Sequence, residues 1–293
     1  MNFDLATSIL LLMGPFITLT TDFGLKDSYV ASMKGVICSI NPQAGIVDIC
    51  HTIEPQNIRQ AAFIFSIAYE YFPPNSIHLV IVDPGVGSDR RKIVLKTPRA
   101  YFVGPDNGVF SYVIDNYSPE FLPGTYLVRP GKQIEAYVIT NSKYWREPVS
   151  NTFHGRDIFA PVGAALSLGV KVSDLGDRVD TVVAFPIPRP KLQKHLITGN
   201  ILHIDNFGNL ITNISNEDIK NFLKQSKPII QIGDFEIKRL DHIYSDVEKG
   251  EPLALIDSSN LLEIAVNLGR AAEYVGTDPG EIVGLAVKIG RYE

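Results

Sequence analysis

Apolar runs and helical patterns alternate along the first two thirds of the chain. Three early runs, 16–21, 46–49 and 77–82, predict strands. Between the first two, Val30, Met33 and Ile37 recur at helical spacing until Pro42 ends the pattern. Further helices are predicted over 55–71 and from 157 to about 168, and further strands over 92–96, 101–103, 125–128 and 136–139. The alternation predicts an α/β domain whose mainly parallel sheet has flanking helices.

The pattern changes at a proline-rich segment, where Pro186, Pro188 and Pro190 alternate with other residues. Such prolines favour an extended connector, because they lack the N–H of a ladder donor. Beyond it the pattern predicts strands and a turn at 206–209; the strands are 199–204, 210–214, 229–232, 253–256, 262–266 and 282–289. We therefore predict an N-terminal extension (1–14), an α/β domain (15–185), a linker (186–198) and an all-β barrel domain (199–293).

The amino-acid composition limits the classes of molecule that the protein is expected to bind. Of 293 residues 45% are hydrophobic and 20% charged, which is typical of an ordered globular chain, and the net charge of −5 argues against nucleic acid or an anionic membrane as ligand. The apolar run 9–13 lacks the basic flank of a signal peptide, and no stretch has the length of a membrane span. Two cysteines provide neither a disulfide framework nor a zinc site. We expect a cytoplasmic protein that binds a small molecule.

Acidic residues follow two of the predicted strands, where ligands of open α/β sheets bind. Asp22 follows the first strand, and its carboxylate can accept hydrogen bonds from a pair of hydroxyls such as a ribose diol. Asp27 either faces an ammonium group or caps the next helix. Asp83 follows the third strand in a glycine-containing loop that matches no phosphate-binding motif, and Arg90 seven residues later forms either a functional or a structural ion pair with it.

A histidine and an Asp-Asn-Gly turn complete the candidates. His154 precedes a predicted helix and is either a catalytic group or an ordinary loop residue; it has no second histidine nearby, which argues against a metal site. Asn107 lies in a segment, 106–108, that forms a good turn by itself.

Five ordered motifs together resemble one family. They are TTDFG at 20–24, VDPGVG at 82–87, PDNGV at 105–109, TFHGRD at 152–157 and DNFGN at 205–209. This set resembles the S-adenosyl-L-methionine (SAM) hydrolases that form adenosine, the SAM hydroxide adenosyltransferases, which are related to the SAM-dependent fluorinase and chlorinase. The resemblance implies an α/β N-terminal domain, a β-barrel C-terminal domain and a homotrimer with SAM bound between subunits.

The resemblance also implies roles for individual residues. The catalytic positions of the family fall on Asp83, Arg90 and His154. Asp22 matches the acceptor of the ribose diol, and Asp27 the partner of the methionine amine. In the C-terminal domain, Asp205 and Ser258 match positions at the methionine end and Phe207 and Asn209 positions at adenine. The remaining candidates for substrate binding are Asn107, Glu263 and the backbone of Val266.

The implied reaction is attack of water on C5′ of the ribosyl group, with methionine leaving as a neutral thioether. Such a leaving group needs no general acid, so the demand falls on aligning and deprotonating water. His154 is the best candidate for proton acceptance, with Asp83 as the alternative, and no metal or other cofactor is implied. Three alternatives stay open: a SAM-dependent halogenase, a non-catalytic SAM- or adenosine-binding protein, and a metal-dependent phosphohydrolase using Asp22, Asp83 and Asp106.

Overall fold

The computed structural model describes residues 15–224, 226–275 and 279–292. The chain forms two compact units, Met1–Ile187 and Pro188–Glu293. Each unit has its own hydrophobic core and is described by itself. The predicted N-terminal extension, 1–14, lies outside the described residues.

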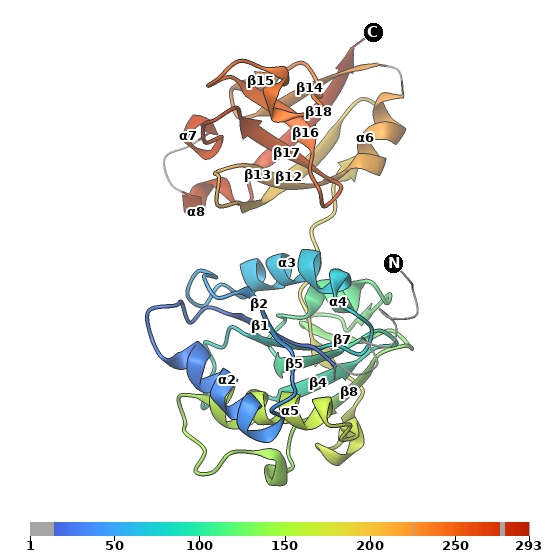
Figure 1. The fold of residues 1–293 in the computed structure, drawn as a ribbon. Helices are drawn as coiled ribbons and strands as arrows, with labels where there is room; N and C mark the ends of the chain where they lie inside the picture. Colours follow the sequence, from blue (N-terminus) through green and yellow to red (C-terminus); the bar gives the residue numbers. More distant parts are fainter. Residues whose placement is uncertain (1–14, 225, 276–278, 293) are drawn as a thin grey trace, which may run out of the picture. The chain divides into compact units, whose positions relative to one another are not determined.

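A seven-stranded sheet forms the centre of the first unit, in the order β2-β1-β3-β5-β4-β8-β9 (Figure 1). Its first four strands are mutually parallel, and the other three are antiparallel to their neighbours. The bounds are β1 Ile17–Thr21, β2 Ile46–Cys50, β3 Ile77–Ile81, β4 Lys92–Lys96, β5 Tyr101–Pro105, β8 Glu135–Val138 and β9 Arg178–Val179. The predicted α/β class with a mainly parallel sheet is confirmed for this unit.

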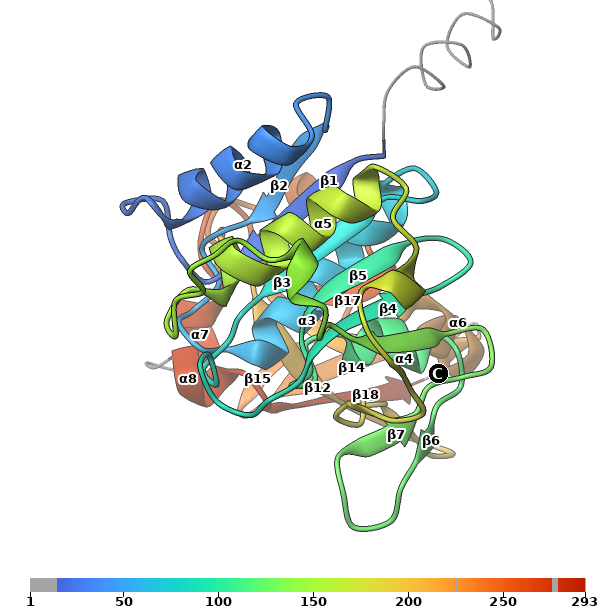
Figure 2. The same ribbon diagram turned by 90° about the horizontal axis from the view of Figure 1, so that it is seen from below.

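Helices cover both faces of this sheet (Figures 1 and 2). On one face, α2 (Tyr29–Ile40) and α5 (Ala160–Ser167) pack Met33 and Ile37 together with Leu79. On the other face, α3 (Ile58–Ala68) and the short α4 (Ser111–Asp115) bury Phe65 against Val80. Alternate side chains of a buried strand such as β3 thus point to opposite faces of the sheet and belong to the two different hydrophobic clusters. A small sheet of β6 (Glu120–Phe121), β7 (Leu127–Arg129) and β10 (Val182–Val183) completes the unit.

The parallel pairing of β1 and β3 positions the predicted acidic residues. Thr21 pairs with Ile81, so the loops that begin at Asp22 and just beyond Val82 leave the sheet at the same edge. Carboxyl ends of parallel strands are where ligands bind in open α/β sheets.

The second unit is a nearly closed antiparallel barrel with the strand order β15-β14-β18-β12-β13-β17-β16, as the sequence predicted. β15 and β16, at the two ends of this order, contact each other. The bounds are β12 Ile197–Ile204, β13 Leu210–Ser215, β14 Lys227–Ile232, β15 Phe235–Ile237, β16 Pro252–Ile256, β17 Leu261–Val266 and β18 Ala286–Tyr292, with β11 Lys191–Leu192 paired to β12 within the predicted linker.

Several element boundaries differ from the sequence predictions. Helix α3 begins at Ile58 and not at Pro55, because Gln56 has a positive φ of 67° and Asn57 caps the helix by accepting from the Gln60 N–H. The helix predicted from 157 begins as a π-helical turn, Gly155–Phe159, that leads into α5. Ile282 ends the short helix α8 (Pro279–Ile282) and does not begin the last strand.

The barrel also contains helices that the sequence analysis did not predict. The longest, α6 (Asn216–Leu223), begins with a capping box in which Ser215 and Asp218 bond to each other's backbone N–H groups. It packs Ile219 and Phe222 into the barrel core. The second short helix is α7 (Ala272–Val275).

Candidate active site

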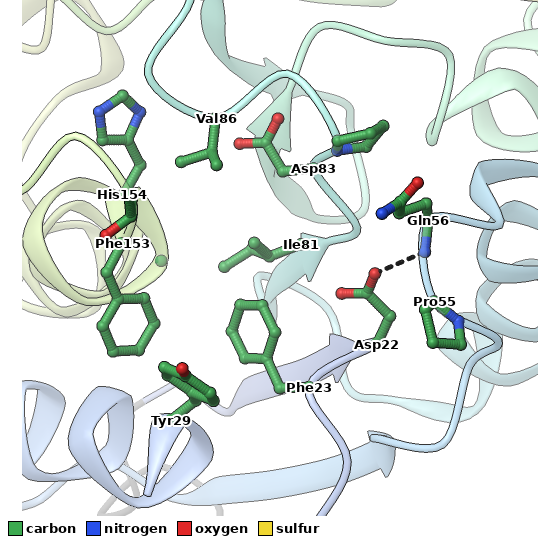
Figure 3. A pocket seen from close by; sticks show the side chains of 13 residues that line it. Asp22, Phe23, Tyr29, Pro55, Gln56, Ile81, Asp83, Val86, Phe153 and His154 are labelled. Atoms are coloured by element: carbon green, nitrogen blue, oxygen red, sulfur yellow. Dashed lines mark hydrogen bonds between the residues drawn. The ribbon is translucent and has the colours of Figure 1, made fainter. Parts of the chain in front are cut away.

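A pocket of about 390 Å³ opens at the carboxyl ends of β1 and β3. Asp22, Asp83 and His154 line it together with apolar and aromatic side chains. Figure 3 shows the carboxylates of Asp22 and Asp83 on either side of Ile81, while Phe23, Tyr29 and Phe153 gather on one side. Four segments far apart in sequence, 22–29, 55–56, 81–86 and 152–155, therefore meet at one cavity.

Arg90 connects Asp83 to His154. The guanidinium donates from Nε to Asp83 Oδ1 at 2.8 Å and from one Nη to Oδ2, so the ion pair is bidentate. The same Nη lies 2.9 Å from Nδ1 of His154. Because a guanidinium has only donors, Nδ1 is the acceptor and the neutral imidazole carries its proton on Nε2. The three predicted catalytic residues thus form one connected cluster.

The cluster is buried, and the positive charge of Lys92 acts on it in addition to the Asp83–Arg90 ion pair. Only 10% of the Arg90 side chain and 6% of the Asp83 side chain are exposed. Burial lowers the pKa of His154, and the charges of Arg90 and Lys92 lower it further, against a smaller opposing effect of Asp83 and Asp157. His154 is therefore neutral at neutral pH, which is the form that accepts a hydrogen bond from Arg90.

One donor of Arg90 is unused. Its Nη1 atom is buried and has no hydrogen-bond partner among the described residues. An unpaired buried donor is costly, so this position favours an oxygen atom of water or of a ligand.

Asp22 occupies the opposite wall of the pocket. Its Oδ2 accepts a hydrogen bond from the backbone N–H of Gln56 at 2.8 Å (Figure 3). This bond fixes the carboxylate and leaves its other oxygen for a hydroxyl group. Beside it, the rings of Phe23, Tyr29 and Phe153 lie 5.1 to 5.7 Å apart between centroids and make an aromatic wall.

Besides Arg90, which contacts Asp83 and His154, three further predicted or considered residues of this unit do not line the pocket. Asp27 is exposed, and the residue that precedes α2 is Ser28, so Asp27 is not its N-cap. Asn107 donates to the Val82 carbonyl and accepts from the Val109 N–H, so it braces the strand end before Asp83. Asp106 is bound to Arg91 and to the backbone of Val183 and does not line the pocket with Asp22 and Asp83.

Four of the residues predicted in the second unit lie in two turns of the barrel. In the β12–β13 turn, Asp205 accepts from the backbone N–H groups of Phe207 and Asn209 and from the Asn209 side chain. Phe207 is 72% exposed at this turn. In the β16–β17 turn, Asp257 accepts from the backbone N–H groups of Ser259 and Leu261. Ser258, the next residue after Asp257 in the sequence, is exposed.

Glu263 and Val266 lie on β17 itself. The Glu263 side chain is buried and accepts from the hydroxyl of Tyr244 at 2.8 Å. Burial raises its pKa to about 6, and Asp205 and Asp257 add to the rise. The Val266 side chain belongs to the barrel core, which leaves only its backbone for a ligand.

The sequence analysis missed two residues that act on predicted site residues, Lys92 on His154 and Tyr244 on Glu263. Lys92, at the start of β4, lies close enough to act electrostatically on His154, and its Nζ is 5.7 Å from the ring centroid of Trp145. Tyr244 lies 19 residues before its partner Glu263. Neither residue belongs to a motif, because their contacts depend on strand pairing and loop packing.

The described segments contain neither a cluster of metal-binding side chains nor a membrane-spanning helix. Among residues 15–224, 226–275 and 279–292, no group of three or more His, Cys, Asp or Glu side chains is arranged to hold a metal ion. In the same segments no helix combines the length and apolarity of a membrane span.

Comparison with known proteins gives matches along nearly the whole chain. Residues 17–176 match the SAM hydroxide adenosyltransferase N-terminal domain, and residues 199–284 match the C-terminal domain. An (R)-S-adenosyl-L-methionine hydrolase of Salinispora tropica is 36% identical over 273 residues, which is 91% of this chain and 96% of the relative. The enzyme of that name from Thermus thermophilus is 34% identical over 269 residues, 90% of this chain and 97% of the relative.

More distant and structural relatives agree with these matches. A fluorinase of Nocardia brasiliensis is 25% identical over 309 residues, covering 94% of this chain and 97% of the relative. The crystal structure of an uncharacterized conserved protein from Thermotoga maritima has a TM-score of 0.82 at 37% identity, covering 94% of this chain and all of that chain. The hydrolases are thus more similar in sequence to this chain than this fluorinase is.

Proposed function

The chain belongs to the SAM hydroxide adenosyltransferase family, and we propose from this membership that it hydrolyses S-adenosyl-L-methionine to adenosine and L-methionine. The observation that carries the proposal is the Asp83–Arg90–His154 cluster, two members of which line one pocket with Asp22. This cluster offers hydrogen-bond acceptors and a fixed positive charge to water. Asp22 offers a carboxylate to a ribose diol, as the resemblance implies.

In the proposed reaction a water oxygen forms a bond to C5′ while the C5′–sulfur bond breaks. The electron pair of that bond stays on sulfur, which changes a sulfonium into the neutral thioether of methionine. One proton of the water must leave to a base. The positive charge of Arg90 and its unused Nη1 donor favour a hydroxide-like oxygen at the moment of attack.

The hydrogen bonds favour Asp83 over His154 as the group that receives the proton. Nδ1 of His154 already accepts from Arg90, and placing a proton there would bring two positive charges together. Asp83 lines the pocket, and a carboxylate retains free lone pairs after a bidentate contact. In this proposal His154 holds Arg90 in position, and Asp83 accepts the proton.

Product analysis tests the activity. Purified protein is incubated with SAM in the presence of EDTA, and adenosine and methionine are quantified by chromatography. Equal amounts of both products, above a protein-free control and above an Asp83→Ala variant, are expected. Absence of adenosine, or its formation only after addition of Mg²⁺, would reject the proposal.

We propose further that the protein is a cytoplasmic homotrimer whose sites are shared between subunits and that it needs no cofactor. Two features support this proposal: the two units each carry predicted binding residues, and the thiols Cys38 and Cys50 are unpaired, as suits a reducing compartment. Mixing an Asp83→Ala chain with an Asn209→Ala chain tests the shared sites. Partial recovery of activity is expected, and a fully active monomer in sedimentation would contradict it.

A further inference from the structure

Glu263 is a buried acid in an acidic environment. Its side chain is 4% exposed at the centre of β17, where its backbone pairs with Ile211 of β13 and Leu255 of β16. The neighbouring charges that act on it are those of Asp205, from the β12–β13 turn, and Asp257, from the β16–β17 turn. Both are negative, so the carboxylate of Glu263 is not neutralised by these neighbours.

Tyr244 donates a hydrogen bond to this carboxylate. Its hydroxyl lies 2.8 Å from Glu263 Oε1, an ordinary length for an O–H···O hydrogen bond. Burial raises the pKa of Glu263 to about 6, and the bond from Tyr244 opposes that rise. Tyr244 therefore favours the ionised form of Glu263, the form that accepts N–H hydrogens.

The segment that carries Tyr244 is itself fixed. Asp246 accepts hydrogen bonds from the backbone N–H groups of His242 and Ile243, which close the turn around Tyr244. The ring is 46% exposed, although its hydroxyl reaches a buried partner. Tyr244 thus connects the buried carboxylate of Glu263 to the surface of the barrel.

We propose that Tyr244 is a positioning residue for substrate binding, which holds Glu263 ionised and directed toward an N–H-bearing group of the substrate. This inference rests on the proposed function and on the sequence-based expectation that Glu263 is one of the substrate-binding residues. SAM offers two such groups, the amino group of adenine and the ammonium of methionine. Each is retained in one product, so the two products distinguish them.

Calorimetric titration of adenosine and of L-methionine tests the role without requiring turnover. Tyr244→Phe removes the hydroxyl and retains the ring. The pKa of Glu263 then rises, so Glu263 is largely protonated at pH 6 and ionised at pH 8.5. We expect about tenfold weaker binding of one product at pH 6, the equivalent of one hydrogen bond to a charged group, and a smaller loss at pH 8.5.

Three further variants serve as controls. Tyr274→Phe removes a hydroxyl that bonds the Gly250 carbonyl in the same unit, and it should change neither affinity. Glu263→Gln should weaken the same product and remove the dependence on pH. Tyr244→Phe combined with Glu263→Gln should add little to Glu263→Gln alone, because both act on one contact.

The outcomes separate this inference from the proposed function. Loss of adenosine affinity assigns Glu263 to the adenine amino group, and loss of methionine affinity assigns it to the ammonium; either supports the positioning role. Normal SAM hydrolysis with unchanged affinities in Tyr244→Phe overturns the inference alone. Product binding that responds to Tyr244→Phe, in a protein that does not hydrolyse SAM, overturns the proposed function alone.

Discussion

A single guanidinium holds both groups that could accept a proton from water. Arg90 donates to Asp83 and to Nδ1 of His154, so the chemistry of each depends on the other. The sequence analysis expected Asp83 to pair with Arg90 and left open whether that ion pair is functional or structural. The hydrogen bond between Arg90 and His154 could not be predicted from the sequence, because 64 residues separate the partners and only the fold brings their loops together.

The role of His154 can be tested by replacing one ring atom. In His154→Asn, the side-chain Oδ1 stands near the position of Nδ1 and can accept from Arg90, although an amide cannot act as a base. We expect His154→Asn to retain kcat within about tenfold of the wild type and His154→Ala to lose about a hundredfold. Steady-state kinetics measures both. Equal losses in the two variants would show that His154 itself takes the proton.

Lys92 should influence the pH at which kcat/KM falls on the acidic side, through its effect on the pKa of His154. Burial and the charges of Arg90 and Lys92 lower the pKa of His154, and only the neutral imidazole accepts from Arg90. The value of kcat/KM should therefore fall as the pH falls through this pKa. Lys92→Gln removes one positive charge and raises the pKa, so the acidic limb should move to higher pH.

The control for this shift lies on the same strand. Lys96, at the end of β4, pairs with Glu135 and has no part in the electrostatics of His154. Lys96→Gln should leave the pH profile of kcat/KM unchanged. An acidic limb that does not move in Lys92→Gln would remove Lys92 from the site.

At the scale of elements, the active-site loops depend on close backbone contact. Gly87 has φ of +81°, and a Cβ built there would lie 2.4 Å from the carbonyl oxygen of Asn151. This glycine joins the loop of Asp83 and Arg90 to the loop that precedes His154. The sequence motif VDPGVG contains the glycine, but the loop that it contacts is visible only in the structure.

Gly87→Ala should therefore damage both stability and catalysis. Gly169, with φ of +85° and no atom within 4 Å of a built Cβ, is the matched control. Both alanine variants should lose roughly 1 to 2 kcal/mol of unfolding free energy from the backbone conformation. Only Gly87→Ala should also lower kcat, because it separates the two loops. Urea denaturation and kinetics measure the two effects; normal kcat in Gly87→Ala would contradict the account.

The sequence predicted elements with continuous apolar runs and missed those defined by local geometry. Strands β1 and β3 are fully buried, and the sequence predicted both within a residue of their bounds, β3 from its mainly apolar run and β1 from apolar residues that alternate with threonine. The π-helical start before α5 and the positive φ of Gln56 left no periodic signal. Helix α6 did have a signal, the Ser215–Asp218 capping box, but its eight residues are short for a helical pattern.

At the scale of the whole molecule, the relatives of the chain include both SAM hydrolases and a fluorinase, so the nucleophile must be decided. A carboxylate about 4 Å from a halide costs about 4 kcal/mol at an effective dielectric of about 20. Asp83 stands at the pocket wall, and its pairing with Arg90 leaves the cluster nearly neutral toward an anion. Water can both donate to Asp83 and accept from Arg90, so the pocket favours water over chloride.

The most direct measurement identifies the atom that is bonded to C5′. The protein is incubated with SAM in H₂¹⁸O containing molar sodium chloride, and the nucleoside products are analysed by mass spectrometry. Attack by water predicts adenosine with one ¹⁸O atom in its 5′-hydroxyl group, together with unlabelled methionine and no 5′-chloro-5′-deoxyadenosine. Unlabelled adenosine, or the chlorinated nucleoside as a main product, would contradict water as the nucleophile at this site.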